Sequence, residues 1–146
     1  MITVILADDH AILRDGLRFL LEAAGDIEIL STAANGQEAI EQATVHCPDV
    51  IVMDISMPVM SGIEATKHIC KICENTKVAI LSMHHTAEYI QRALEAGAVG
   101  YLLKDSAGAE LVNAIRAVND GKRYISKGVA KNFGEGNSLW GGTSTN

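Results

Sequence analysis

The sequence predicts an α/β protein whose parallel sheet is covered by helices on both faces. Five short apolar segments alternate strictly with five helical patterns along the chain. Such alternation builds a parallel sheet through right-handed crossovers. The central apolar segments contain almost no polar residues, as strands do when both faces of a sheet are buried. We therefore expect a doubly wound (βα)5 domain with a five-stranded parallel sheet.

The elements follow in order along the chain. The predicted strands are residues 3–7, 28–32, 50–53, 78–82 and 100–103. The first predicted helix carries apolar residues at the spacing of one helix face, namely Leu13, Leu17, Leu20, Leu21 and Ala24. The last helix repeats this stripe at Leu111, Ala114, Ile115 and Val118. Weaker helical patterns cover residues 37–44, 63–71 and 87–96. Turn-forming residues mark the boundaries: Gly25, Asn35, Gly36, Pro48, Gly62, Gly97 and Gly121.

Length and composition limit the classes of protein. A chain of 146 residues, 48% of them apolar, fits one compact domain, which we assign to residues 1–130. Residues 131–146 are rich in glycine and are expected to form a flexible tail or linker stub. The net charge of −6 argues against unaided binding to nucleic acid. No apolar run approaches the roughly 20 residues that span a bilayer. With no signal peptide and three cysteines, we expect a cytoplasmic protein.

Carboxylates follow two of the apolar runs. Asp8 and Asp9 come directly after residues 3–7, and Asp54 comes directly after residues 50–53. Open α/β folds bind their ligands at the carboxyl ends of the strands. Three carboxylates at one edge repel each other unless a proton or a cation neutralises them, and Mg²⁺ prefers such oxygen ligands. The sequence therefore predicts a Mg²⁺ site beside an aspartate that can act as a nucleophile, although Asp8 or Asp9 could instead cap the next helix.

Two further polar residues complete a pattern that resembles a known family. Ser82 ends the fourth apolar run, and Lys104 follows the fifth. Together with the aspartates they resemble the response regulator receiver domain, over residues 1–130. The segments 81–84, 100–105 and 121–126 are similar to the NarL/LuxR-type subfamily. This resemblance implies the flavodoxin/CheY-like strand order 2-1-3-4-5. It also implies a C-terminal helix-turn-helix DNA-binding domain, which we do not expect within these 146 residues.

The resemblance also implies the role of each site residue. Asp54 accepts a phosphoryl group from the phosphohistidine of a sensor histidine kinase. Asp8, Asp9, Asp54 and the backbone carbonyl of Ser56 hold Mg²⁺. Lys104 and the Ser82 hydroxyl contact phosphoryl oxygens. Ser82 and the aromatic Tyr101 form the switch, in which Tyr101 fills the space that Ser82 vacates. The domain is then a signalling switch rather than an enzyme, with at most slow autodephosphorylation.

The partners implied are the histidine kinase and, through the effector domain, DNA. The resemblance implies a responding surface made of residues 88–96 and 110–118 together with Tyr101. The subfamily also uses its first and fifth helices, so the sequence does not decide which face carries the output. A homodimer formed on phosphorylation is a further partner that the resemblance allows. No membrane partner is expected. Asp105 replaces the proline that many receivers carry after the lysine, so we expect a trans peptide bond there.

Three cysteines lie outside this pattern. Cys70 and Cys73 form a C-x-x-C motif near His68, and His46 precedes Cys47. A zinc site would need these ligands to converge, and a thioredoxin-like site would need the first cysteine at a helix N-terminus. We expect cysteines on the helix surface or half-buried, at the sheet edge opposite Asp54. His84 and His85 are expected to be surface residues.

Two other functions share parts of the pattern. A metal-dependent phosphatase with an aspartyl nucleophile needs a second carboxylate two residues later, where this chain has Ser56. A flavodoxin-like FMN carrier needs a phosphate-binding loop after its first strand, where Asp8 and Asp9 would repel a phosphate. Both alternatives are therefore disfavoured by residues at their decisive positions.

Overall fold

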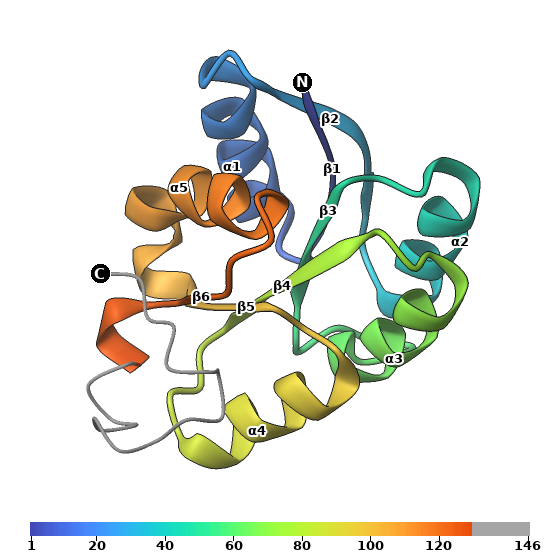
Figure 1. Cartoon of the computed structure of the whole chain (residues 1–146), viewed down its shortest axis with the longest axis vertical. Helices are drawn as coiled ribbons and strands as arrows, with labels where there is room; N and C mark the ends of the chain where they lie inside the picture. The colour runs from blue at the N-terminus through green and yellow to red at the C-terminus, as the bar shows by residue number, and fades with distance from the viewer. Residues whose placement is uncertain (130–146) are drawn as a thin grey trace.

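The computed structural model describes residues 1–129 and shows a parallel sheet between two layers of helices (Figure 1). The strands are β1 (Ile2–Ala7), β2 (Ile27–Ala33), β3 (Val50–Asp54), β4 (Lys77–Ser82), β5 (Gly100–Leu103) and β6 (Tyr124–Ile125). The helices are α1 (Ala11–Ala23), α2 (Gly36–His46), α3 (Gly62–Ile72), α4 (Ala87–Ala96) and α5 (Ala107–Asn119), and a short 3₁₀ helix, η1 (Lys104–Ser106), follows β5.

The sheet has six strands in the order β2-β1-β3-β4-β5-β6. The predicted strand order 2-1-3-4-5 is confirmed, but the prediction of five strands is wrong by one. β6 pairs in parallel with β5, through Tyr124 opposite Gly100 and Ile125 opposite Tyr101. A strand of two residues is too short to give a hydrophobic period, so the sequence pattern after Gly121 carried no signal for it. The predicted tail, residues 131–146, lies outside the described residues.

Side chains of each central strand alternate between the two helix layers. In β3, Ile51 and Met53 pack in the cluster beneath α2, α3 and α4, whereas Val50 and Val52 pack in the cluster beneath α1 and α5. Helix α1 buries Leu17 and Leu21 of its predicted stripe. Both faces of the sheet are therefore covered, which explains why the strands are apolar throughout.

A close approach of two segments fixes the turn after β3. Gly62, the first residue of α3, donates its N–H to the Ile55 carbonyl at 2.9 Å. A Cβ atom at this position would collide with the carbonyl oxygen of Asp54 and press on the Met53 side chain. Glycine therefore lets α3 begin directly against the end of β3. As predicted, the peptide bond between Lys104 and Asp105 is trans.

Candidate functional site

The strand register brings the predicted site residues to one edge of the sheet. β1 and β3 end in register, so Asp8 and Asp54 leave adjacent strands side by side. β4 and β5 likewise end in register, which places Lys104 just beyond Ser82. Neighbouring strands therefore deliver these residues to the carboxyl edge where open α/β sheets bind ligands.

Asp54 lies at the centre of this edge and is 1% exposed. Its Oδ2 accepts a hydrogen bond from Lys104 Nζ at 2.8 Å, and its Oδ1 accepts one from the backbone N–H of Ser56 at 3.1 Å. Burial raises the pKa of Asp54 to about 6, and the nearby Asp8 carboxylate adds to this rise, while the Lys104 ammonium opposes it. Desolvation therefore outweighs the ion pair, which is usual where carboxylates are crowded for a chemical role.

Asp8 is fully buried and only partly satisfied. Its Oδ1 accepts the backbone N–H of His10 at 2.8 Å. Its Oδ2 has no hydrogen-bond partner, and the nearest ammonium, that of Lys104, lies 3.4 Å away. A buried carboxylate oxygen without a partner is costly in a folded protein. This oxygen therefore points to a ligand at this edge of the sheet.

His10 also lies in the site, where the sequence pattern did not predict it. Its Nδ1 lies 3.1 Å from Asp8 Oδ1, 3.4 Å from Asp9 Oδ1 and 3.0 Å from Lys104 Nζ. His10 is also the N-cap residue of α1, so neither Asp8 nor Asp9 caps that helix. Its place directly after two aspartates was a usable signal, but a histidine beside acidic residues is too common in sequences to be specific.

The acidic residues could hold a metal ion. Ligand atoms of Asp8, Asp9, His10 and Asp54 all lie within 4.8 Å of one another. The donors from the three aspartates are carboxylate oxygens, as Mg²⁺ prefers, and Asp8 has one carboxylate oxygen, Oδ2, without a hydrogen-bond partner. Ser56 contributes its N–H to Asp54, and the metal-binding role of its carbonyl stays a prediction. The residues present therefore fit a hard divalent cation.

The two predicted switch residues contact the same loop residue. Ser82 is buried, and its Oγ accepts the backbone N–H of His84 at 2.9 Å. Tyr101 is fully buried, and its hydroxyl donates to the His84 carbonyl at 2.7 Å. The His84 ring stacks on Tyr89 of α4 with centroids 3.8 Å apart. Ser82 and Tyr101 are therefore joined to each other and to α4 through His84, which is half-buried, whereas His85 is exposed.

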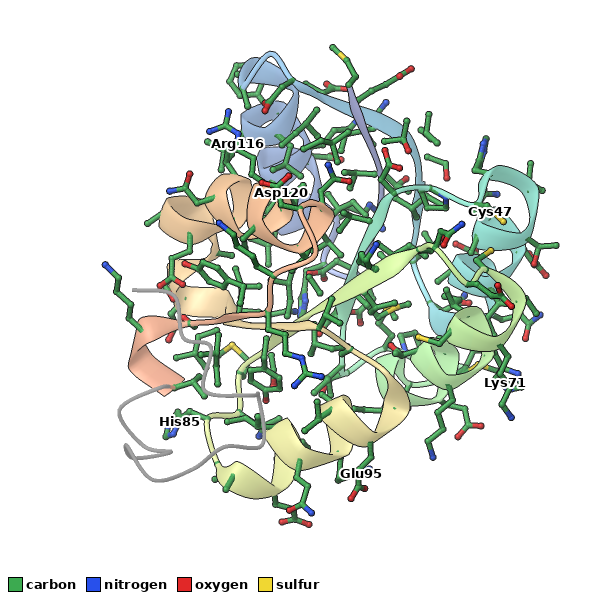
Figure 2. The ribbon with its side chains drawn as sticks, in the orientation of Figure 1. Cys47, Lys71, His85, Glu95, Arg116 and Asp120 are labelled. Carbon is green, nitrogen blue, oxygen red and sulfur yellow. The ribbon has the colours of Figure 1, made fainter. Side chains whose placement is uncertain are left out.

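The cysteines lie away from this edge. Cys47 precedes β3 and His85 follows β4, and Figure 2 shows these two residues on opposite sides of the molecule. Cys47 and Cys73 approach each other, whereas Cys70 turns toward the carbonyl of Gly97, the residue that follows α4. Within residues 1–129, only the acidic cluster brings three or more metal-binding side chains together, so the cysteines gain no support as a zinc site.

Comparison with known proteins identifies the family that shares this arrangement. The model of the "Response regulator receiver domain" family matches residues 4–116. The transcriptional regulatory protein LiaR of Bacillus subtilis is 43% identical over 130 residues, which cover 89% of this chain and 62% of LiaR. The chain thus spans about three fifths of the length of this curated relative.

None of the helices in the described part is long and apolar enough to cross a membrane.

Solved structures share the fold. A LuxR-family two-component response regulator from Aurantimonas superposes with a TM-score of 0.86 at 38% identity, covering 90% of this chain and 94% of that one. One chain in the structure of a complex of CheX with CheY, BeF₃ and Mg²⁺ from Borrelia burgdorferi superposes with a TM-score of 0.75 at 26% identity, covering 80% of this chain and 88% of that one. The predicted fold class is therefore shared with proteins of this kind.

Proposed function

Since the chain belongs to the response regulator receiver domain family, we propose that Asp54 is its phosphoryl acceptor. The domain is a receiver of the LuxR/NarL type and acts as a signalling switch in a two-component system. The donor we propose is the phosphohistidine of a sensor histidine kinase. Neither the phosphatase nor the flavin-carrier alternative gains support from the family match.

This proposal rests mainly on one observation: the buried side chains of Asp8 and Asp54 both lie beside the Lys104 ammonium group at the strand ends. An Asp54 carboxylate oxygen forms the new bond to phosphorus, and the donor histidine leaves with the electrons of the broken bond. Lys104, which already contacts Asp54 Oδ2 at 2.8 Å, is placed to pair with a phosphoryl oxygen instead. Phosphoryl transfer depends mainly on such positioning and charge neutralisation.

We assign the metal ligands to Asp8, Asp9, Asp54 and the Ser56 carbonyl. Mg²⁺, when bound, supplies the positive charge that neutralises these carboxylates and the phosphoryl oxygens. Two observations support this assignment: Asp8 Oδ2 has no hydrogen-bond partner, and the acidic side chains converge. The Borrelia CheY complex, which contains Mg²⁺ and BeF₃, adds a precedent from a similar protein.

Ser82 and Tyr101 form the proposed switch, with His84 as the link between them. If the Ser82 hydroxyl turns toward a phosphoryl oxygen, it gives up the His84 N–H that it now accepts. The Tyr101 ring is already buried here. We therefore expect phosphorylation to shift the 83–86 loop and α4 rather than to bury the ring, which is a population shift between two local arrangements.

Transcriptional control belongs, in our proposal, to a DNA-binding domain outside this receiver domain. Its relative LiaR is named as a transcriptional regulatory protein and is longer than this chain. Because the chain carries a net charge of −6, we expect no sequence-specific DNA binding from these residues alone. Phosphorylation-dependent self-association is the output we expect from the domain itself, and light scattering with and without beryllofluoride would measure it.

Intact mass spectrometry tests the acceptor directly. Acetyl phosphate with Mg²⁺ should add one phosphoryl group to the wild type and none to Asp54→Asn. Asp120→Asn is the matched control, because Asp120 is an exposed aspartate that caps the C-terminus of α5. This control should be labelled like the wild type. Labelling of Asp54→Asn to the wild-type level would reject Asp54 as the acceptor.

Amide exchange tests the switch separately. Beryllofluoride should change the exchange of residues 82–101, and Tyr101→Phe should reduce this response because it removes the hydrogen bond to His84. Unchanged exchange, with the mimic bound at Asp54, would leave the acceptor chemistry in place and reject the switch.

A further inference from the structure

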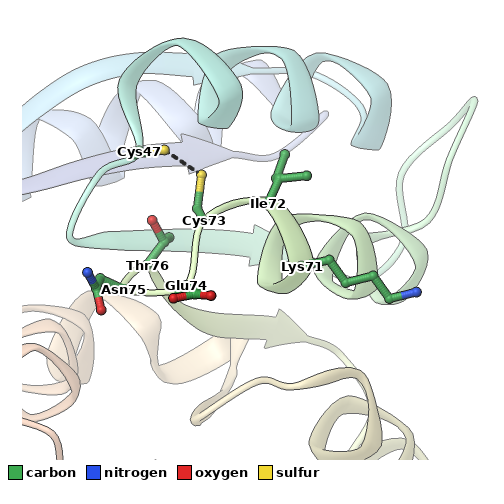
Figure 3. A pocket seen from close by; sticks show the side chains of 7 residues that line it. All are labelled: Cys47, Lys71, Ile72, Cys73, Glu74, Asn75 and Thr76. Carbon is green, nitrogen blue, oxygen red and sulfur yellow. Dashed lines mark hydrogen bonds between the residues drawn. The ribbon is translucent and has the colours of Figure 1, made fainter.

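Two cysteine sulfur atoms meet at the end of the sheet opposite Asp54 (Figure 3). Cys47 is the residue that follows α2, and Cys73 is the residue that follows α3. Their Sγ atoms lie 2.6 Å apart, although 26 positions separate the residues in the sequence. A disulfide requires a separation of about 2.05 Å, so the bond needs a movement of only about half an ångström.

Backbone hydrogen bonds hold both cysteines in place. The N–H of Cys47 donates to the Ala43 carbonyl at 2.7 Å, and the N–H of Cys73 donates to the Ile69 carbonyl at 2.9 Å. The Cys73 thiol also donates to the Ala43 carbonyl at 3.3 Å. The neighbouring Thr76 hydroxyl donates to the Pro48 carbonyl at 2.6 Å, which ties the same two segments together again. The hydrogen bonds at the C-terminal ends of the two helices therefore hold the two sulfur atoms close to each other.

The two thiols differ in access to solvent. Cys47 is exposed and Cys73 is 4% exposed. A surface pocket of about 440 Å³ lies beside them and is lined by both cysteines and by residues 71, 72 and 74–76. A volume of this order accommodates a small organic molecule. A small reactant can therefore reach the exposed Cys47 sulfur more easily than the buried Cys73 sulfur, which lies against Cys47.

We propose that Cys47 and Cys73 are a thiol–disulfide site, which low-molecular-weight disulfides such as oxidised glutathione convert into an intramolecular disulfide. The Cys47 thiolate attacks one sulfur of the small disulfide, and a small thiolate leaves. Cys73 then gives up its proton and attacks the Cys47 sulfur, and the second small thiolate leaves. The cysteine pair loses two electrons and two protons, and the reactant becomes two thiols.

The order of the two steps follows from burial. Burial raises the pKa of the Cys73 thiol to about 11, and its contact with Cys47 adds to this rise. Cys73 is therefore protonated near neutral pH and is the resolving thiol rather than the first nucleophile. Cys70 provides an internal comparison, because its Sγ lies near the Gly97 carbonyl at 3.8 Å and takes no part in the pair.

Mass spectrometry with thiol counting tests the proposal. The reduced full chain is incubated with oxidised glutathione, quenched in denaturant with N-ethylmaleimide, and weighed. The count of alkylated thiols should fall from three, the number of free cysteines, to one, with no glutathione retained. The peptide map should join Cys47 to Cys73. Cys70→Ser is the matched control and should form the same bond.

The single variants separate this site from general thiol reactivity. Cys47→Ser, at the exposed position, should form no intramolecular bond. Cys73→Ser should keep a glutathione adduct on Cys47, because the resolving thiol is gone. Persistent glutathione on Cys47 of the wild type, a bond to Cys70, a bond between two chains, or three unreacted thiols would each overturn the proposal.

A melting experiment tests the geometry. The bond would close a loop between residues 47 and 73, and such a constraint stabilises the folded state. Oxidation should raise the melting temperature by roughly 5–10 °C, and dithiothreitol should reverse the rise. An unchanged or lower melting temperature would contradict the claim that the native positions suit the bond.

Discussion

At the carboxyl end of the sheet, two buried carboxylates share one ammonium group, whereas at the amino end two polar residues satisfy each other through hydrogen bonds. Asp8 and Asp54 meet around Lys104, and Asp8 Oδ2 has no hydrogen-bond partner. At the opposite end, Asp49 Oδ2 accepts both the N–H and the hydroxyl of Thr3, at 2.9 and 3.1 Å. The Asp49 N–H donates back to the Thr3 hydroxyl at 2.9 Å.

This contrast separates groups that stabilise the fold from groups kept for chemistry. Mutual hydrogen bonds, such as those of Thr3 and Asp49, contribute modestly to stability. Crowded, incompletely satisfied carboxylates oppose stability unless a ligand neutralises them. The carboxyl end should therefore respond strongly to charge, pH and metal, while the amino end should respond only to the loss of its own contacts.

The largest expected effect comes from removing the ammonium group. Lys104→Met leaves Asp8 and Asp54 buried with no cation between them, so the free energy of unfolding at pH 8 should fall by about 3–5 kcal/mol. Urea unfolding measures this. Lys122→Met, at an exposed lysine, is the control and should change stability by less than about 0.5 kcal/mol. Equal losses in the two variants would remove the contrast between the buried edge and the surface.

The pH dependence of stability should reveal Asp54. Its pKa is raised from 3.8 to about 6 in the folded protein, so the folded state binds the proton more tightly than the unfolded state does. Proton binding by Asp54 therefore stabilises the folded state. This contribution is complete below about pH 4 and is lost as the pH rises through about 6. In metal-free buffer, the wild type should therefore lose stability between pH 4 and pH 8, and Asp54→Asn should not lose this contribution. The free energy of unfolding of Asp54→Asn, relative to that of the wild type, should rise by about 2–3 kcal/mol over this range.

Denaturant titrations at several pH values give this difference. Asp120→Asn, at an exposed aspartate, should follow the wild type across the range. A difference between Asp54→Asn and the wild type that does not change with pH would mean that Asp54 titrates alike in the folded and unfolded chains.

Magnesium should stabilise the carboxyl end by mass action. At a concentration ten times its Kd, the gain is about 1.4 kcal/mol, and calorimetry would show it as a higher melting temperature. Asp9→Asn should weaken this dependence more than Asp8→Asn if Asp9 binds the ion directly and Asp8 binds it through a water. A melting temperature that ignores Mg²⁺ in the wild type would remove the metal from the site.

The smallest effect is expected at the amino end. Asp49→Ala removes the acceptor of two hydrogen bonds from Thr3, and should cost about 1 kcal/mol of stability. Phosphoryl labelling of Asp54 should not change, because these contacts lie at the other end of the strands. A large drop in labelling of the still-folded variant would show that the two ends are coupled.

Particular residues show how far sequence reasoning reached. Asp8, Asp54 and Lys104 were predicted to meet because each follows an apolar strand, and parallel strands end at one edge. Ser82 and Tyr101 were predicted to act together as a switch, and both hydrogen-bond to the backbone of His84. The sequence pattern did not predict this link through His84. Backbone contacts of a loop residue depend on where the loop lies, which no residue pattern encodes.

The sequence by itself determined the alternating elements, the polar residues at the strand ends and therefore the edge at which the site lies, because short-range periodicity and strand direction are local properties. The tertiary structure decided the rest. It added β6, whose two residues become a strand only beside β5. It brought His10 against Lys104 and Cys47 against Cys73, pairs separated by 94 and 26 positions. Such contacts depend on packing between distant segments, and packing is settled only when the whole core forms.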